Sequence, residues 1–184
     1  MQLVTHRPLT VHDYRGLPDV GPQYQLVEGD LFMAPAPNRF HQTVAGEIYY
    51  ALKFYLDNNP AGKAYIAPFD VFLTDLNVYQ PDVCFFSQER YPFLTDEGAS
   101  GPPDIVVEVL SPRTAHLDLG LKKEIYARTG VLEYWVVDPA THQVSVWHLA
   151  ENSQTPAFTL PKNGTLTTSI LPGFALRLER VFVE

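Results

Sequence analysis

The sequence is poor in cysteine, in positive charge and in long apolar runs. One cysteine, Cys84, stands among 184 residues, which excludes an internal disulfide framework and a zinc site built from several cysteines. No apolar run approaches the roughly 20 residues that a membrane helix needs. Residues 1–14 contain no unbroken apolar stretch of the kind found in a secretion signal. We therefore expect a cytoplasmic protein without a membrane partner.

Positive charge is also scarce. Lysine and arginine number 13 against 21 aspartates and glutamates, which gives a formal net charge of −8. Proteins that coat nucleic acid are usually basic, and an acidic chain repels phosphates at long range unless a local basic patch or bound metal ions reverse the field. This balance argues against tight, sequence-independent binding of nucleic acid by a monomer. It leaves a nucleic-acid enzyme open.

The remaining composition is that of a globular protein. Hydrophobic residues make up 46% of the chain and charged residues 18%, and the length suits one domain over residues 1–184. Proline and glycine fall between periodic segments, as they do within a single domain. The sequence predicts a mixed sheet with at least two helices, in the α/β or α+β class.

The periodicity predicts most elements individually. Two short apolar runs flank Glu28-Gly29 and predict an N-terminal β-hairpin over residues 24–33. The pattern predicts helices over 41–57 and 115–129, the second capped by Gly130. It further predicts strands over 64–73, 78–86, 104–110, 133–138 and 143–149, a loop over 87–103, and one or two strands within 156–184.

Two acidic residues interrupt apolar strands. Glu108 lies inside Ile105-Val106-Val107-Glu108-Val109-Leu110, and a carboxylate there is costly unless it is paired, protonated or bound to a cation. Asp82 follows Pro81, whose missing N–H predicts an edge, a strand start or a bulge. Taken singly, an Asp after Pro is most often a turn residue, and a Glu in an apolar strand is sometimes an edge residue that faces solvent. As a pair on neighbouring strands, they favour a site for Mg²⁺, which prefers few carboxylates and retains several waters.

A lysine on the second predicted helix lies close to these acids in sequence. Asp118, Lys122 and Tyr126 are spaced i, i+4, i+8 and share one helix face. The spacing of Leu117, Leu121 and Ile125 predicts that these residues form the buried face, so the Lys122 stem can lie along apolar surface while its ammonium reaches the sheet. The alternative is an Asp118–Lys122 surface pair of a few tenths of a kcal/mol.

Several motifs occur together in one order and resemble a known family. The Pro81-Asp82 and Glu108 pair is similar to the signature of the PD-(D/E)XK nuclease superfamily. The longer context resembles the family of putative restriction endonucleases of the Uma type within that superfamily. The matching segments are Tyr24 to Leu31, His41-Gln42, Ala67 to Val71, Gln80 to Val83, Pro103 to Pro112, Lys122-x-x-x-Tyr126-Ala127-Arg128 and Gly130-Val131-x-Glu133-Tyr134-Trp135-x-Val137-Asp138-Pro139.

The resemblance implies a restriction-endonuclease-like fold, with a central mixed sheet flanked by helices and an active site at the sheet edge. It implies hydrolysis of DNA phosphodiester bonds with Mg²⁺ or Mn²⁺, Asp82 and Glu108 as metal ligands, and Lys122 as a third catalytic residue. Two departures from the pattern stand out. No lysine stands two residues after Glu108, so Lys122 on the following helix takes its place, and Gln25 stands where an acid is frequent.

Two other functions stay open. The missing strand lysine and the acidic charge favour a catalytically inactive module that binds nucleic acid or protein. The ten tyrosines, eleven phenylalanines and two tryptophans allow a small-molecule hydrolase with an aromatic pocket, which we rank lowest. Tyr49, Tyr50, Phe54 and Tyr55 fall on the first predicted helix and favour a homodimer, since two-fold pairing is the commonest assembly.

Three further polar residues receive weaker assignments. His41 begins the first helix and suits a phosphate contact, although a capping or surface histidine is the commoner case. Asp104 is a poor third metal ligand, because four residues of strand separate it from Glu108 by about 13 Å. Asp30 is a candidate outer ligand, with a turn residue as the commoner role, and the role of Glu28 stays open.

Overall fold

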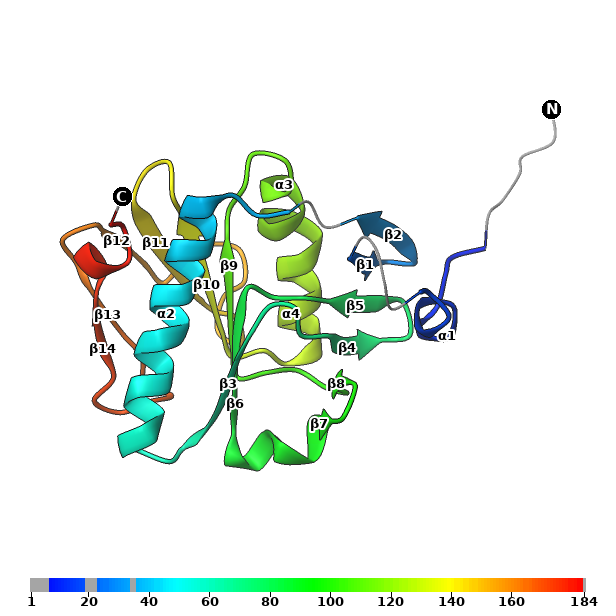
Figure 1. The fold of residues 1–184 in the computed structure, drawn as a ribbon, viewed down its shortest axis with the longest axis horizontal. Coiled ribbons are helices and arrows are strands. Elements are labelled where there is room, and N and C mark those ends of the chain that lie inside the picture. Colours follow the sequence, from blue (N-terminus) through cyan, green and yellow to red (C-terminus); the bar gives the residue numbers. More distant parts are fainter. Residues whose placement is uncertain (1–6, 19–22, 34–35, 184) are drawn as a thin grey trace.

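The computed structural model describes residues 7–18, 23–33 and 36–183. Residues 1–6, part of the segment in which no secretion signal is expected, lie outside this range. Figure 1 shows a mixed α and β protein with one long helix on one side of a sheet and a shorter, interrupted helix beyond it. In the part of the chain described, no helix combines the length and apolar character needed to cross a membrane.

The central sheet carries the candidate site. It is mixed, because β9 and β10 run parallel while each of the other neighbouring pairs is antiparallel, as the sequence predicts. Its strands, in spatial order, are β12 (Phe158–Pro161), β11 (Gln143–His148), β10 (Glu133–Asp138), β9 (Ile105–Val109), β6 (Val83–Ser87) and β3 (Gly62–Ile66).

A second sheet, here called the side sheet, extends away from the central one toward the amino terminus (Figure 1). Its strands, in spatial order, are β2 (Asp30–Met33), β1 (Tyr24–Val27), β5 (Asn77–Tyr79), β4 (Val71–Thr74), β8 (Gly98–Ala99) and β7 (Leu94–Thr95). The short helix α1 (Val11–Arg15) precedes it, and a separate hairpin joins β13 (Thr165–Thr167) to β14 (Ala175–Arg177) before the 3₁₀ turn η3 (Leu178–Arg180).

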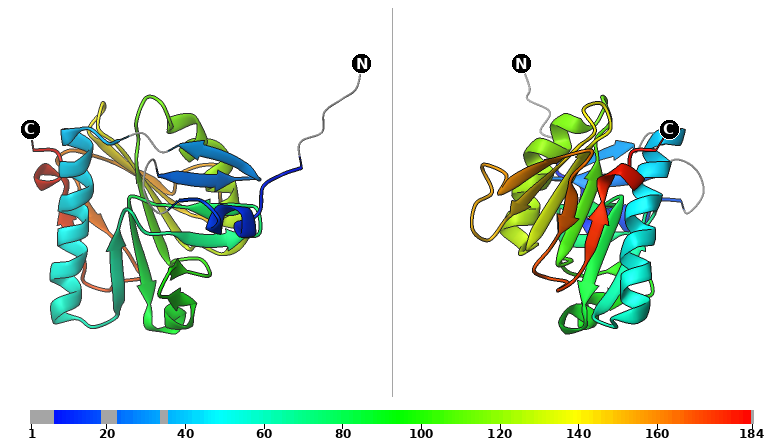
Figure 2. Two further views of the ribbon diagram at one scale, coloured as in Figure 1. Left: turned by 45° about the vertical axis from the view of Figure 1, so that its right-hand side comes forward. Right: turned by 90° about the vertical axis from the view of Figure 1, so that its left-hand side faces the viewer.

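Helix α2 (Arg39–Asn58) covers one face of the central sheet, close to the predicted 41–57. The Asn38 side chain caps its start by accepting the His41 N–H at 2.8 Å. Its apolar stripe includes Val44, Ile48 and Leu52, each fully buried against the sheet. The two views of Figure 2 show α2 on one side of the central sheet and α4 on the other.

The second predicted helix occupies residues 115–129 but contains a break. It consists of α3 (Ala115–Leu117), the π-helical turn η2 (Asp118–Lys122) and α4 (Lys123–Thr129), with non-helical backbone angles at Gly120. Gly130 ends α4 in the left-handed conformation with φ 99°, as predicted. The predicted burial of Leu121 is wrong, because the π turn rotates the face, leaving Leu121 45% exposed and burying Asp118 and Lys122.

The N-terminal hairpin is confirmed. Strands β1 and β2 pair in antiparallel register across Glu28 and Gly29, which both have positive φ and so match the turn that suits the strand twist. The fold class and the strands over 104–110, 133–138 and 143–149 are likewise confirmed within a residue at most at each end.

Four predicted segments differ from the structure. The expected strands 64–73 and 78–86 each divide between the two sheets, so that β3 and β6 pair in the central sheet while β4 and β5 pair in the side sheet. The expected loop 87–103 contains the 3₁₀ turn η1 (Gln88–Phe93), β7 and β8. The tail holds β12, β13 and β14 rather than one or two strands, because short alternations give a weak signal.

Candidate active site

Two neighbouring central strands bring Asp82 and Glu108 to the same end of the sheet. Asp82 directly precedes β6, and β6 pairs with β9 in antiparallel register with Val83 opposite Val107. One step along this register sets Asp82 beside Glu108. The Val109 N–H, next to Glu108 in β9, donates to Asp82 Oδ2 at 2.7 Å and ties Asp82 to that strand. The expected location at the sheet edge is therefore the end of two central strands and not a lateral edge strand.

Strand alternation decides which way Glu108 points. Val107 and Val109 pack into the core beneath α2, while Val106 packs with α4 on the opposite face. Glu108 shares the face of Val106 and is 4% exposed. There its Oε1 lies 2.6 Å from Lys122 Nζ and accepts the Tyr126 hydroxyl at 2.9 Å.

Lys122 is held between two carboxylates. Its Nζ donates to Asp118 Oδ1 at 2.9 Å in addition to its contact with Glu108. The π turn presents both Asp118 and Lys122 to the interior, and the Tyr134 hydroxyl fixes the turn by donating to the Asp118 carbonyl at 3.0 Å. Such single-turn π segments recur at functional sites. The alternative of a surface Asp118–Lys122 pair is wrong, since both side chains are 5% exposed.

Burial dominates the electrostatics of this cluster. It raises the pKa of Glu108 to about 8, although the neighbouring Lys122 ammonium acts in the opposite direction. Burial lowers the pKa of Lys122, but the Glu108 and Asp118 carboxylates outweigh that effect and raise it overall, so the amine stays protonated. The pKa of Tyr126 is raised by burial and by Glu108, and its hydroxyl remains a donor. The site thus holds two carboxyl groups and one ammonium out of water, and in the protein alone burial favours the protonated form of Glu108 at neutral pH.

The donor set fits a hard divalent cation that keeps most of its water. Asp82 uses Oδ2 and Glu108 uses Oε1 for the contacts above, while Asp82 Oδ1 and Glu108 Oε2 accept no hydrogen bond from the residues that the structure describes. Two carboxylates at the same end of neighbouring strands, each with one oxygen outside these contacts, are donors of the kind that Mg²⁺ prefers. No group of three or more His, Cys, Asp or Glu side chains arranged for metal binding occurs within 7–18, 23–33 and 36–183, so a closed all-protein cage is not what these residues build.

His41 also belongs to the site, although its sequence context favoured a capping or surface role. Its Nε2 lies 3.3 Å from Asp82 Oδ2, and its side chain is 13% exposed. Burial lowers the pKa of His41, but the Asp82 carboxylate more than compensates, so the net pKa is raised. Its Nδ1 is buried without a hydrogen-bond partner among the described residues. The signal available in the sequence was its place at the start of the helix that covers the Asp82 strand.

Other sequence candidates serve the scaffold. Asp104 accepts the Ser87 N–H at 2.6 Å and pairs with Arg90 at 3.0 Å, so its carboxylate is engaged away from Asp82 and Glu108. Glu28, in the hairpin turn, pairs with Arg128 of α4 at 3.1 Å.

The aromatic residues line two hollows, and neither includes Asp82. One hollow of about 590 Å³ lies beside Tyr50 and Phe54 on the outer face of α2. The other, of about 470 Å³, is formed by α1, β1, β4 and their neighbours. The idea of a hydrolase with an aromatic pocket at Asp82 finds no support in either.

Comparison with known proteins identifies the family and the fold of the chain. The model of the Uma2 family, described as "Putative restriction endonuclease", matches residues 11–179. The chain belongs to the Uma2 family. A crystal structure of a putative nuclease belonging to DUF820 from Anabaena variabilis superposes with a TM-score of 0.78, covering 95% of this chain and 98% of that one at 18% identity. At that identity the likeness shows the fold, which is nuclease-like. No curated protein matches the chain.

Proposed function

We propose that this Uma2 protein is a Mg²⁺-dependent (or Mn²⁺-dependent) endonuclease that hydrolyses phosphodiester bonds of DNA. One observation carries the proposal: Asp82 and Glu108, 26 positions apart, meet at the ends of β6 and β9 with a buried lysine against Glu108. A structural role alone does not account for burying Glu108 at such a cost to its ionised form. The family match supports the same chemistry.

The charge balance of the chain fits this reading. Asp82 and Glu108 repel the phosphate that they would have to approach, as does the net charge of −8. When bound, a divalent ion supplies the positive charge that offsets the phosphate and activates the attacking water. The protein then needs only two carboxylates in fixed positions. The Val109 N–H fixes Asp82, and the Tyr126 hydroxyl fixes Glu108.

Lys122 has a positioning role in this scheme. Its ammonium lies 2.6 Å from Glu108 and lowers the pKa of that carboxyl relative to burial alone, which favours the ionised form that a metal ion needs. The expectation that Lys122 also orients the attacking water stays a prediction. His41, through Nε2 beside Asp82, is placed to share that carboxylate or to meet a phosphate oxygen.

Plasmid cleavage tests the proposal. Purified protein with supercoiled DNA and Mg²⁺ or Mn²⁺ should give nicked and linear forms, with none in EDTA. Asp82→Asn and Glu108→Gln, which preserve shape but remove charge, should each lower the rate by at least about 100-fold, taking one lost charge-stabilising group as the guide. Asp57→Asn, a carboxylate 69% exposed on α2, is the matched control and should cut at the wild-type rate. Equal cutting by all four proteins would contradict the proposal.

The inactive-module alternative makes the opposite prediction. A module without a metal site gains no stability from Mg²⁺ or Mn²⁺ in a thermal melt, whereas binding to the native state must raise the melting temperature. A rise in wild type that is absent in Asp82→Asn favours the enzyme.

We also propose that the protein is a homodimer paired across α2. Tyr50 and Phe54 stack at 6.2 Å and remain 55% and 61% exposed. They line the 590 Å³ hollow together with Glu47 on one wall and Arg177 and Arg180 on the other. Because this apolar patch carries both charge signs, a two-fold related copy can set Glu47 against an arginine of its partner. A second copy is therefore the occupant that suits it.

Sedimentation velocity tests the dimer. Wild type should sediment as a dimer, and Phe54→Ser should shift it to a monomer. Met33→Ser, which removes a side chain 62% exposed on β2, should stay dimeric. A monomeric wild type at tens of micromolar protein would rule the pairing out.

A further inference from the structure

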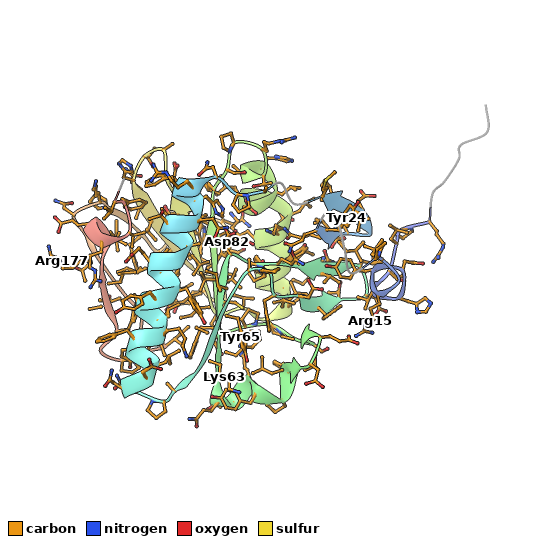
Figure 3. All side chains as sticks on the ribbon, viewed as in Figure 1. Arg15, Tyr24, Lys63, Tyr65, Asp82 and Arg177 are labelled. Carbon is orange, nitrogen blue, oxygen red and sulfur yellow. The ribbon has the colours of Figure 1, made fainter. Side chains whose placement is uncertain are left out.

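The second hollow is polar, lies between α1 and the side sheet, and is not used by the proposed chemistry. It measures about 470 Å³, within the range of small-ligand sites. In Figure 3 the labelled Tyr24 and Arg15 mark this side of the molecule, on the side sheet and α1, with Asp82 nearer the centre. Residues that line it include Tyr14, Tyr24, Asp70, Phe72 and Gln80.

We propose that this hollow binds one unpaired nucleobase of the DNA substrate and prefers guanine. The inference rests on the proposed function for its biological substrate, but it names a binding site that can be tested without metal or cleavage. Three features support it. They are the aromatic residues that line the hollow, the oxygen atoms there that accept no hydrogen bond from the part of the chain described, and the short separation between Gln80 and Asp82 along the chain.

Aromatic rings supply the walls. Tyr14 meets Phe72 edge to face with ring centroids 6.3 Å apart, and the Arg15 guanidinium lies 5.0 Å from the centre of the Phe72 ring. Tyr24 contributes a third ring. Enzymes that take a base out of the stack hold it between such side chains and read its Watson–Crick edge with hydrogen bonds.

Two of the oxygens that line the hollow are acceptors without a donor among the described residues, although Arg15 and the Gln80 amide also carry donor groups. Asp70 Oδ1 accepts from the Tyr14 hydroxyl at 3.1 Å and from Gln80 Nε2 at 2.7 Å. Asp70 Oδ2 and Gln80 Oε1 accept nothing from the residues that the structure describes. Burial raises the pKa of Asp70, as expected for a carboxylate that lacks enough donors. Arg15 does not supply them, since it pairs with Glu97 at 3.1 Å.

Guanine is the base that fits two adjacent acceptors. Its Watson–Crick edge carries an imino N–H and an exocyclic amino group side by side, while cytosine and adenine each carry a single amino donor group there and thymine a single imino N–H. A carboxylate and an amide oxygen can take both guanine donors. A cationic peptide side chain is the competing ligand for an acceptor-rich hollow, and the test includes it.

The hollow lies within reach of a strand bound at Asp82. Gln80 lines the hollow and is two residues from Asp82, a span of at most about 7 Å. A strand with its phosphate at Asp82 thus has a neighbouring base close enough to enter.

Nucleotide binding without metal is the direct test. In EDTA, titration by heteronuclear NMR should give binding of 2′-deoxyguanosine 5′-monophosphate at least tenfold tighter than that of thymidine 5′-monophosphate. Shifted resonances should include those of Asp70 and Gln80. Asp70→Asn turns one acceptor into a donor and should abolish the preference, and Gln80→Met should reduce it. Asp57→Asn should bind as wild type does. An arginine-containing peptide should bind more weakly than the guanine nucleotide.

Mapping of plasmid cut ends separates this inference from the proposed function. Guanine should be enriched beside wild-type cuts, and the bias should disappear in Asp70→Asn whatever its rate. Cutting with no guanine bias and no nucleotide preference would overturn the base site and leave the nuclease intact. Guanine binding by a wild type that never cuts would support the base site and overturn the nuclease. Tighter binding of the arginine peptide would overturn the base site.

Discussion

In the buried Glu108–Lys122–Asp118 cluster, neutralising Lys122 and neutralising Glu108 should have different effects on the stability of the protein. In the cluster one ammonium contacts two buried carboxyl groups, with Lys122 Nζ 2.6 Å from Glu108 and 2.9 Å from Asp118. Lys122→Met leaves two carboxylates facing each other in the interior. Removing one partner of a buried pair costs about 3–5 kcal/mol. For a protein of this size that lowers the melting temperature by roughly 6–20 °C.

Glu108→Gln should behave differently. It leaves a balanced Lys122–Asp118 pair, and glutamine keeps an oxygen that can accept from the Tyr126 hydroxyl. We therefore expect the free energy of unfolding to change by less than about 1 kcal/mol, toward greater stability if it changes. DNA cleavage should be lost. Loss of cleavage at unchanged stability would assign Glu108 to function and not to the scaffold.

Urea and thermal unfolding of wild type, both single variants and the double variant measure this. The double variant should be more stable than the sum of the single effects predicts, by about 0.5–3 kcal/mol. A loss under 1 kcal/mol in Lys122→Met, or a loss in Glu108→Gln as large as that of Lys122→Met, would refute the reasoning.

Three smaller predictions concern the scaffold. The folded-state pKa of Asp70 lies above its ordinary 3.8, so its contribution to stability is full below pH 3.8 and is lost as pH rises through the folded value. Asp70→Asn should therefore gain stability relative to wild type between pH 3.5 and pH 7. Thermal melts at both pH values measure this, and a constant difference would contradict it. Asn38→Ala removes the acceptor for the His41 N–H and should cost about 1 kcal/mol in urea unfolding. Gly130→Ala, at φ 99°, should cost roughly 1 kcal/mol or more, and an unchanged midpoint would argue against the left-handed cap.

Local signals predicted the parts of the fold that depend on local chemistry. The α2 stripe, the turn at Glu28 and Gly29 and the Gly130 cap each follow from residues adjacent in sequence. The division of residues 64–73 between two sheets did not, because both halves have strand-like sequences and the pairing that separates them is long-range.

The candidate site shows the same division. Asp82 and Glu108 stood out because acids interrupt apolar strands, and their meeting followed from the expectation of one sheet. The approach of Lys122 to the sheet was predicted, but the exposure of Leu121 was not. Helical periodicity does not reveal the extra residue of a π turn at Gly120. His41 reaches Asp82 through the packing of α2 on the sheet, which no short-range pattern encodes.

The central claim is that Asp82 and Glu108 together hold one divalent ion. Titration of Mn²⁺, followed by electron paramagnetic resonance of the free ion, tests it most directly and needs no DNA. We predict one ion bound per wild-type chain and per Asp57→Asn chain, with affinity reduced at least tenfold in both Asp82→Asn and Glu108→Gln. Equal Mn²⁺ binding by all four proteins, or none by wild type, would contradict the claim.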